Sequence, residues 1–438
     1  MKYFQTILLI VFGFIFVISL LVFGGILPGF RAPKGGSGGT LILWGTLPKT
    51  KMDLIMSDVN KQYEAFFNLV YVEKQPFTFD TDLIEALATG QGPDIFFLNH
   101  EAIGPNSNKV ALIPYSSYSA RIFSDTFVSG ASIFQLSKGL MAIPLYVDPL
   151  VMYYNKDLLT NAGLAEVPKN WPALLVASKA LTKLDPQGNV TQSTVAFGEF
   201  TNNRNAKDVL SLLILQAGNS IVSLDASDKP QITLGQNATT NGLAPARSAV
   251  DFFIQFANPS KTVYNWNRSL PEASTAFING SLAFYFGFGS ELSGLTTRNP
   301  HLFFDLSPVP QRNEAGARQL TFGRFTGLAI SVQSKKPTYA LQAIQALTSS
   351  AYAGRVALLA QASPVRRDLL AIGDLDPKRA VIFKSGLISR AWFDPNPLVT
   401  KKIFSDLVAS VMTGLADIAN ALNTANKELL NLFNKKNG

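Results

Sequence analysis

Two spacings of hydrophobic residues alternate along most of this chain, one typical of short buried strands and the other of amphipathic helices. Residues 40–44 (TLILW) form an apolar run of strand length, and residues 52–66 then carry apolar side chains three and four positions apart. Residues 68–73 predict a second strand, residues 80–88 a second helix and residues 94–98 a third strand. Because strands that alternate with helices favour parallel pairing, we expect a layered α/β sheet covered on both faces.

The same alternation continues to the end of the chain. A strand pair is expected at residues 140–154, interrupted at Asp148 and Pro149. Several of the later helices are predicted to end at Gly or Asn. Further helices are expected at residues 155–162, 171–184, 206–217, 245–257, 404–415 and 418–433, and further strands at residues 281–286, 303–309 and 327–332.

The N-terminal segment differs from the rest because it has no charged residue between positions 3 and 30. A helix over residues 6–27 would be about 33 Å long, which is enough to cross a hydrocarbon core of about 30 Å. A cleaved signal peptide and a permanent anchor are the two interpretations, but no small-x-small cleavage site follows and no Cys can carry a lipid. We therefore expect an uncleaved transmembrane anchor over residues 1–30, followed by a flexible Gly, Ser and Pro linker over residues 31–39.

Composition excludes several classes of chemistry. The chain has 438 residues, 47% of them hydrophobic and 16% charged, which suits one large two-lobed body or about three domains. The absence of Cys excludes disulfides, thiolate metal sites and cysteine nucleophiles. The chain has only two His, far apart in sequence, and it has no phosphate-loop or dinucleotide-binding motif. We therefore expect no metal and no cofactor. The net charge is +8, but no run of Lys or Arg exceeds two, so nucleic acid is not an expected partner.

Six segments carry recognisable motifs: residues 41–45 (LILWG), 83–99 (LIEALATGQGPDIFFLN), 141–164 (MAIPLYVDPLVMYYNKDLLTNAGL), 167–175 (VPKNWPALL), 276–289 (AFINGSLAFYFGFG) and 362–370 (ASPVRRDLL). In this order they resemble the extracellular solute-binding proteins of ABC importers, the maltose-binding-like group that captures sugars. The resemblance covers residues 40–434 and departs from the family at the missing lipid-attachment Cys and in the loops.

The resemblance implies a fold of the periplasmic-binding-protein-like type II class, an α/β fold with two lobes and an inter-lobe cleft that closes around its ligand by hinge motion. It places three crossings of the chain between the lobes, near residues 147–149, 322–327 and 368–373. The implied domains are an N-terminal lobe of residues 40–148 and 325–370 and a C-terminal lobe of residues 149–324 and 371–438.

Five candidate ligand-binding residues end or follow two predicted strands of the first lobe. Trp44 and Gly45 end one strand, and Asn99, His100 and Glu101 follow another. Ligands of open α/β sheets sit at the carboxyl ends of strands, where an indole can stack on a sugar and polar side chains can bind hydroxyls. Core packing for the Trp and a helix cap for the polar residues are the alternatives.

Three further candidates are acids and an aromatic that the resemblance places in the cleft. Asp148 lies at the first crossing, where the family has an acidic residue and where a carboxylate can accept two sugar hydroxyls. Glu199 and Phe200 match the acid and the aromatic expected in the wall of the second lobe. A surface loop is the alternative for Glu199.

The last three candidates also come from the resemblance. Phe288 lies where the family often has a Pro-Trp pair, and its FGS context weakens the case for stacking at that position. Arg324 and Trp392 match regions that touch ligand in relatives, and packing at the lobe interface is their alternative.

These features predict a monomeric, membrane-tethered extracytoplasmic receptor, not an enzyme, that captures a small solute and delivers it to the permease subunits of an ABC importer. The solute is expected to be a sugar or oligosaccharide, because aromatic platforms and planar hydroxyl partners suit carbohydrates. An amino-acid ligand would need a charged clamp, for which Arg324 alone is thin support. Two other functions stay open: a sensory or scaffold ectodomain of the same fold, and a glycosidase-like enzyme that pairs Asp148 with Glu199.

Overall fold

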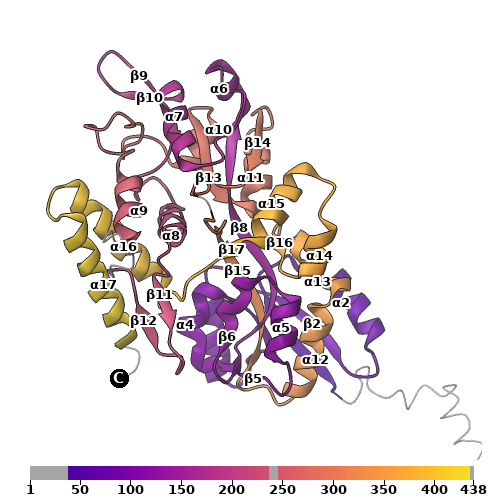
Figure 1. Ribbon diagram of the computed structural model, residues 1–438. Coiled ribbons are helices and arrows are strands. Elements are labelled where there is room, and N and C mark those ends of the chain that lie inside the picture. Colours follow the sequence, from indigo (N-terminus) through magenta and orange to yellow (C-terminus); the bar gives the residue numbers. More distant parts are fainter. Residues whose placement is uncertain (1–37, 236–244, 315, 435–438) are drawn as a thin grey trace, which may run out of the picture.

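The computed structural model describes residues 38–235, 245–314 and 316–434. Figure 1 shows two lobes, one above the other, connected by long strands that run from one lobe into the other. Each lobe has its own hydrophobic core. The expected anchor over residues 1–30 lies outside the described residues, and within the described ranges no helix is long and apolar enough to cross a membrane.

The first lobe is a sheet with helices packed on it. Its strands are β1 (Thr40–Gly45), β2 (Asn68–Glu73), β3 (Ile95–Asn99), β4 (Val110–Ala111), β5 (Ile113–Pro114), β6 (Gln135–Leu136), β7 (Gly139–Leu140) and β16 (Ser363–Pro364). Its helices are α2 (Lys49–Gln62), α3 (Phe79–Ala88), the short 3-10 helix η1 (His100–Ala102), α4 (Ile103–Asn106), α5 (Ala120–Thr126), α12 (Pro337–Leu347) and α13 (Ser350–Leu359).

The second lobe repeats this layered arrangement with more helices. Its strands are β9 (Lys183–Leu184), β10 (Val190–Val195), β11 (Val222–Leu224), β12 (Pro230–Ile232), β13 (Leu282–Phe288) and β14 (Phe304–Ser307). Its helices are α6 (Lys156–Asn161), α7 (Trp171–Leu181), α8 (Ala206–Gln216), α9 (Pro245–Ile254), α10 (Ala273–Ile278), η4 (Gly289–Glu291), α11 (Leu292–Arg298), α16 (Pro397–Met412) and α17 (Ile418–Asn434).

Two strands, β8 (Ile143–Asn155) and β15 (Thr321–Ser331), run between the lobes and pair with each other antiparallel. The sequence predicted a break at Asp148 and Pro149, and this was wrong, because β8 continues through both residues. Pro149 lies opposite Gly323 of β15, at the point where β13 takes over as the partner of β8 from Leu150 onward. The missing N–H of proline therefore falls where the ladder changes partners and costs little.

The pairing pattern is mixed rather than parallel throughout. β1 pairs parallel with both β2 and β3, and β10 pairs parallel with β13, as the strand–helix alternation predicted. β15, in contrast, is antiparallel to both β3 and β8. Parallel pairing is expected of strands that are joined by one crossover helix. β15 is far from β3 and β8 in the sequence, so no single helix sets its direction relative to them.

A third connection follows β16 and consists of α14 (Arg367–Ile372), α15 (Pro377–Leu387) and β17 (Ser389–Arg390). β17 pairs with the first residues of β15, and the chain then enters α16 of the second lobe. Strands β8 and β15 and this connection together set how the lobes sit against each other.

Local sequence explains many of the helices. In α7, Asn170 accepts a hydrogen bond from the backbone N–H of Ala173 at 2.9 Å, and Pro172 lies in the first turn, where its missing N–H costs nothing. In α2, the buried residues Met52, Ile55 and Val59 are spaced three and four apart, as the hydrophobic pattern predicted.

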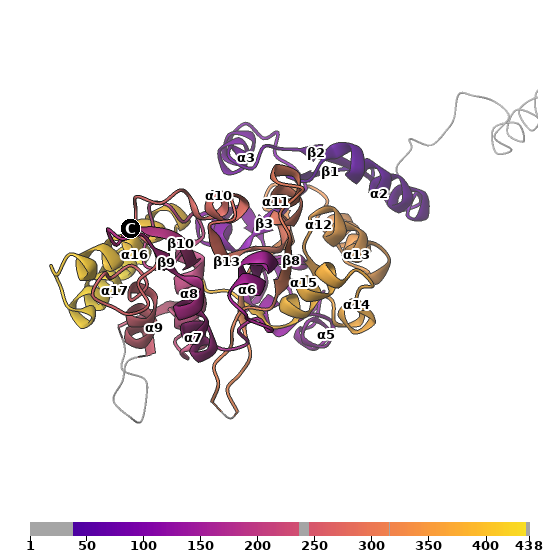
Figure 2. The ribbon, with the colours of Figure 1, turned by 90° about the horizontal axis from the view of Figure 1, so that it is seen from above.

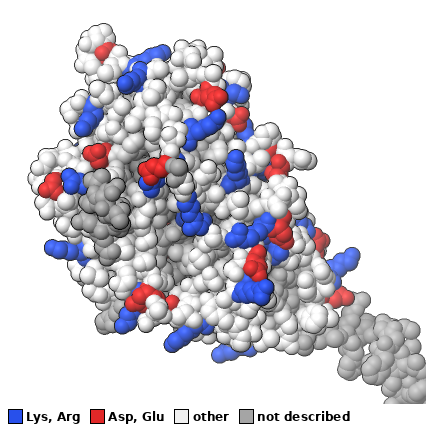
Figure 3. Space-filling model, viewed as in Figure 1, with Lys and Arg blue, Asp and Glu red and all other residues white. Residues whose placement is uncertain are grey.

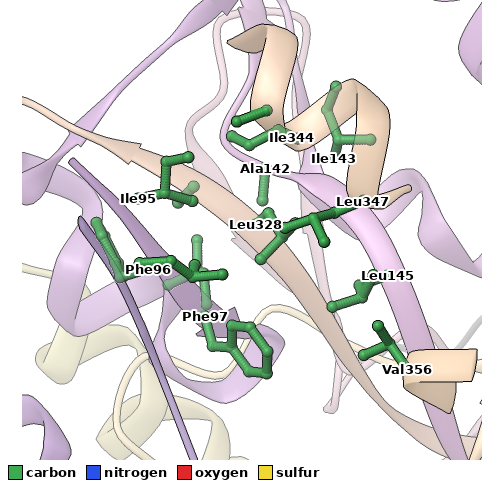
Figure 4. Close-up of a cluster of buried hydrophobic side chains, with 14 of the residues drawn as sticks. Ile95, Phe96, Phe97, Ala142, Ile143, Leu145, Leu328, Ile344, Leu347 and Val356 are labelled. Carbon is green, nitrogen blue, oxygen red and sulfur yellow. The ribbon is translucent and has the colours of Figure 1, made fainter. Parts of the chain in front are cut away.

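The core of the first lobe holds the central strands rigidly against the helices. Figure 4 shows Phe96 and Phe97 of β3, Leu328 of β15 and Leu145 of β8 packed below Ile344 of α12. Close packing of this kind transmits strain rather than absorbing it. The edge of this sheet is therefore a firm platform for a site.

Candidate ligand-binding cleft

Polar and aromatic side chains from three neighbouring strands meet at one edge of the first lobe. Thr326 of β15 is paired with Asn99, the last residue of β3, and also with Tyr146 of β8. Thr46 directly follows β1. These four residues line a pocket of about 230 Å³, which we call the first-lobe pocket, together with Pro76, Phe79, Asp80, Phe97 and Ala102.

The first-lobe pocket combines hydrogen-bonding groups with aromatic rings. Burial raises the pKa of Tyr146 to about 12, so its hydroxyl stays neutral and can both donate and accept. The ring of Phe97 meets that of Tyr146 edge-on at 6.4 Å. Asp80 is held by Asn106, whose amide donates to its Oδ1 at 2.8 Å. Such a mixture suits a ligand with hydroxyls and apolar C–H faces.

Next to this pocket, a cluster of charged side chains joins the two lobes. We call it the junction cluster, and its members are Glu101, Lys207, Asp208, Arg324 and Asp394. Lys207, from α8 of the second lobe, lies 2.7 Å from Glu101 of the first lobe and 2.8 Å from Asp394. The side chains of Lys207 and Asp394 are only 6% and 2% exposed, so this bridge is shielded from solvent.

Arg324 ties β15 into the same cluster. Its Nη2 donates to Asp208 Oδ2 at 2.7 Å, its Nε lies 3.8 Å from Glu101 Oε2, and its guanidinium stacks at 4.0 Å on the ring of Phe288. Asp208 Oδ1 and Arg324 Nε are buried without a hydrogen-bond partner among the described residues. The lobes are thus connected by a network of charges in which Lys207, Asp208 and Asp394 are buried and the side chain of Arg324 is 35% exposed.

Burial and neighbouring charge act in opposite directions on the carboxylates of the junction cluster. For Glu101, burial alone would raise the pKa, but the charges of Lys207 and Arg324 outweigh it and lower the pKa. For Asp208 and Asp394, burial prevails and raises the pKa, although Arg324 and Lys207 oppose it. Glu101 is therefore the carboxylate most firmly held in its charged form.

Asp148, at the centre of β8, faces the second lobe rather than open solvent. Its carboxylate accepts from the backbone N–H of Ser290 at 3.0 Å and from the Ser290 hydroxyl at 2.5 Å. Burial raises its pKa to about 7, although the Ser290 bonds and the charge of Arg324 lower it in part. Asp148 is opposite Arg324 in the β8–β15 ladder, so both lie at the crossing.

Three of the predicted residues of the first lobe have mainly structural roles. Trp44 is 7% exposed and has Lys74 over its ring at 3.9 Å, while a side chain at Gly45 would meet the ring of Tyr71 at 2.9 Å. Asn99 caps η1 by accepting from the backbone N–H of Glu101 at 2.9 Å, which is the cap interpretation that the sequence left open. Asn99 also lines the first-lobe pocket, so the two roles coexist.

His100 is buried between the lobes and holds backbone in place. It is 1% exposed, and its Nδ1 accepts from the backbone N–H of Phe325 at 3.2 Å. Burial lowers its pKa to about 4, so the imidazole is neutral under ordinary conditions. In the ranges the structure describes, no group of three His, Asp or Glu side chains is arranged to hold a metal ion.

The predicted aromatic platforms of the second lobe lie in its core. Phe200 is 8% exposed and packs at 6.0 Å from Phe253. Trp392 is 2% exposed, stacks at 5.9 Å on Phe404 and donates from Nε1 to the Ser211 hydroxyl at 3.1 Å. This burial favours the packing interpretation of Trp392, because neither face of the indole is free to receive a sugar.

Two further predicted residues have fixed partners. Glu199 accepts from Arg268 at 3.3 Å, so its carboxylate is held at the surface of the second lobe. Phe288 is 2% exposed and serves as the base on which Arg324 stacks. Of the predicted set, the structure thus brings Glu101, Asp148, Phe288 and Arg324 together at the crossing.

Sequence reasoning missed most of the charges on the second-lobe side of the cleft. Lys207 and Asp208 are adjacent opposite charges that open an otherwise largely apolar helix (AKDVLSLLILQ), and this pattern is the signal that could have found them. Glu291 binds the Tyr285 hydroxyl at 2.6 Å and the Asn205 amide at 2.9 Å. Tyr285 is only six residues from Glu291, but Asn205 is 86 residues away, so the sequence does not reveal this part of its environment.

A second contact between the lobes lies outside the junction cluster. The backbone N–H and the hydroxyl of Ser137 donate to the carboxylate of Asp228 at 2.8 and 2.6 Å. Ser137 is in the turn between β6 and β7, and Asp228 is in the turn between β11 and β12. Unlike the junction cluster, this contact is exposed to solvent.

The fold has many solved counterparts. The chain is similar to a cyclo/maltodextrin-binding protein complexed with maltotetraose, at 17% identity and a TM-score of 0.71, covering 93% of this chain and 98% of that one. It is also similar to the cyclic alpha-maltosyl-1,6-maltose binding protein from Arthrobacter globiformis, at 14% identity and a TM-score of 0.73, covering 91% and 99%. The sugar-binding protein MalE from Xanthomonas citri has 18% identity and a TM-score of 0.72, covering 91% and 98%.

At these identities the likeness establishes the two-lobed fold. A sequence model of one family, described as bacterial extracellular solute-binding protein, matches residues 68–354, which is well over half of the chain. This match covers β8, most of the second lobe and Arg324. The chain therefore belongs to the family of bacterial extracellular solute-binding proteins.

Proposed function

We propose that this protein captures a sugar or oligosaccharide in the cleft between its lobes and delivers it to the permease of an ABC importer. The observation that carries the proposal is the first-lobe pocket, where Tyr146, Asn99, Thr326 and Asp80 offer donors and acceptors beside aromatic rings. Solved structures of the same fold include proteins in complex with maltotetraose, cycloalternan and maltotriose. Hydroxyl-binding groups beside apolar rings are what a carbohydrate needs from its site.

The proposed mechanism uses the lobes as two halves of one site. The ligand first binds the first-lobe pocket, and rotation about β8, β15 and the third connection then brings the second lobe over it. We keep residues 40–148 and 325–370 as the first lobe, and residues 149–324 and 371–438 as the second lobe, as a working division. Small-angle scattering with saturating ligand should show a smaller radius of gyration, and an unchanged radius would count against closure.

A glycosidase that pairs Asp148 with Glu199 is less well supported. Asp148 accepts two hydrogen bonds from Ser290, and Glu199 is bound by Arg268. Each carboxylate therefore has its own protein partner on a different part of the molecule. A sugar panel incubated with the protein should yield no hydrolysis product under conditions where binding is observed.

The ligand class is tested by isothermal titration of the purified domain with monosaccharides, oligosaccharides, amino acids and polyamines. We expect heat from at least one carbohydrate and none from the other two classes. Binding of an amino acid or polyamine with no carbohydrate response would overturn the assignment while leaving the fold unaffected.

Membrane tethering and delivery form a separate part of the proposal. The apolar run over residues 6–27 would anchor the chain, and residues 31–39 would link it to the first lobe, which begins at β1. The intact mass of the membrane fraction should include the N-terminal segment. A mature chain that starts near residues 29–40 would contradict the anchor. Co-purification with permease subunits would separate a transport role from a sensory one.

A further inference from the structure

One aromatic side chain beside the first-lobe pocket is left completely in solvent. Phe77 is 101% exposed, whereas the other large aromatic side chains counted as exposed in the described ranges, Phe66 and Phe303, are 49% and 56% exposed. Its neighbours Pro76 and Phe79 both line the pocket. Leaving a whole phenyl ring in water forgoes the free energy of burying it, on the order of 2 kcal/mol.

The segment that carries Phe77 is held at both ends. It lies between β2 and α3, and the backbone N–H of Lys74 donates to the carbonyl of Gly45 at 2.8 Å. The ammonium of Lys74 lies 3.3 Å from Asp82 in the first turn of α3. A turn bond from Thr78 to Gln75 closes the segment. Phe77 is therefore presented from a fixed position at the rim of the pocket.

The pocket itself is too small for a long ligand. Its volume of about 230 Å³ is below the ~300–1,000 Å³ of sites that enclose a drug-sized molecule. An oligosaccharide that places one ring in the pocket must therefore extend the next ring over the rim. Pro76 and Phe79 line the pocket, and Phe77 lies between them in sequence.

The residues predicted as platforms in the second lobe are not exposed enough to stack against such a ring. Phe200, Phe288 and Trp392 are 8%, 2% and 2% exposed. In Figure 2, α3 lies on the same side of the molecule as α10 and α11 of the second lobe.

We propose that Phe77 is the aromatic platform for a second sugar ring, and hence that the ligand is an oligosaccharide of two or more units rather than a monosaccharide. The proposal rests on the function proposed above and adds to it a length requirement. It assigns the stacking role to the first lobe, at a position that the sequence analysis did not single out. The apolar face of a pyranose would cover the exposed phenyl ring on binding.

The test compares Phe77→Ala with Phe66→Ala, using isothermal titration with a panel of mono-, di- and trisaccharides in the gluco, galacto and fructo series. Phe66 precedes β2 and Phe77 follows it, so the control lies at the other end of the same strand. Phe77→Ala should weaken di- and trisaccharide binding about tenfold and leave monosaccharide binding unchanged. Phe66→Ala should change neither.

Phe77→Trp supplies an independent readout. The variant should bind a disaccharide at least as tightly as the wild type, and a fluorescence change of its new indole should follow disaccharide but not monosaccharide binding. Unchanged disaccharide affinity in Phe77→Ala, or an equal loss for monosaccharides, would overturn the platform role alone. A wild type that binds no member of the panel would overturn the proposed function, and with it this inference.

Discussion

The first-lobe pocket and the junction cluster lie side by side, yet they are built from opposite chemistry. Asn99 lines the pocket together with hydroxyl groups, aromatic rings and one carboxylate, Asp80, whereas Glu101, two residues later, enters a buried ion pair with Lys207. The pocket keeps space that a ligand can fill. In the junction cluster, the charged side chains already pair with one another, so the cluster connects the lobes and leaves no room for a sugar.

This difference explains why the carboxylates of the junction cluster are poor candidates for direct sugar contact. Lys207 forms ion pairs with Glu101 and Asp394, and Arg324 forms an ion pair with Asp208. Charged partners that are buried together are costly to separate, because each would be left unpaired in a medium of low dielectric constant. On the outer face seen in Figure 3, by contrast, Lys and Arg are interspersed with Asp and Glu in open solvent.

The largest expected effect comes from removing the cation of the junction cluster. Lys207→Met removes the cation between Glu101 and Asp394, leaves the buried Asp394 without an ion-pair partner among the described residues, and should lower the free energy of unfolding by about 3–5 kcal/mol. Lys402→Met is the matched control, because the side chains of Lys402 and Asp406 are 74% and 56% exposed. Denaturant unfolding measures both. Equal losses in the two variants would show that the junction cluster contributes no more than a surface pair.

The pH dependence of stability tests Asp148 at the crossing. Its pKa in the folded protein is about 7, above the ~3.9 of an unfolded chain, so the folded state binds the extra proton and loses stability as pH rises from about 4 to about 7. Asp148→Asn cannot titrate. The free energy of unfolding of the wild type minus that of Asp148→Asn should therefore fall over this range, by at most about 4 kcal/mol.

The comparison with Asp148→Asn is needed because His100 changes in the opposite sense. Burial lowers the pKa of His100 to about 4, so its contribution to stability grows as pH rises toward the ordinary pKa of histidine. Both proteins contain His100, and its effect cancels in the difference. A difference that stays flat between pH 4 and 7 would contradict the buried, protonated state of Asp148.

The pocket is tested by deleting one hydroxyl. Tyr146→Phe keeps the ring and its contact with Phe97 but removes a hydrogen-bonding group from the pocket wall. Sugar affinity should fall about tenfold, which corresponds to about 1.4 kcal/mol. Tyr115→Phe is the control, because its hydroxyl bonds the carbonyl of Leu136 away from the pocket. Equal affinities for Tyr146→Phe and the wild type would remove Tyr146 from the site.

The smallest effect is expected at the exposed contact between the lobes. Ser137→Ala removes the hydroxyl bond to Asp228 but keeps the backbone one, so the free energy of unfolding should fall by less than about 1 kcal/mol. Ser260→Ala removes a comparable exposed bond, to Asn258 within one loop. A loss for Ser137→Ala as large as that for Lys207→Met would mean that the exposed contact, not the buried cluster, holds the lobes.

Much of the fold could be predicted from the sequence, because its elements have strong periodic patterns and clear caps. The helix beginning at Trp171 and the strand 68–73 are examples of this. β8 was predicted as two strands, because proline usually interrupts a strand. Pro149 is tolerated because β8 changes its partner strand from β15 to β13 at this point, and that change depends on the tertiary structure. Local sequence cannot show where a ladder exchanges partners.

The site was less predictable for a related reason. Lys207 is 106 residues from Glu101 and 187 from Asp394, and pairs at such distances leave no spacing pattern. Phe200 and Trp392 could be recognised as aromatics near the cleft, but whether an aromatic residue faces a ligand or the core depends on its neighbours in space. The position of Asn99 at the carboxyl end of β3, where it lines the first-lobe pocket, could be predicted because chain order reveals strand ends, and its contact with a ligand stays a prediction.

The most direct test of the account is a crystal structure with the sugar that titration identifies. The account predicts that one sugar ring lies in the first-lobe pocket within hydrogen-bonding distance of Asn99, Tyr146 or Thr326, with the second lobe closed over it. A sugar bound instead in the separate pocket between Ser132, Val222 and Phe393, with the first-lobe pocket empty, would contradict it.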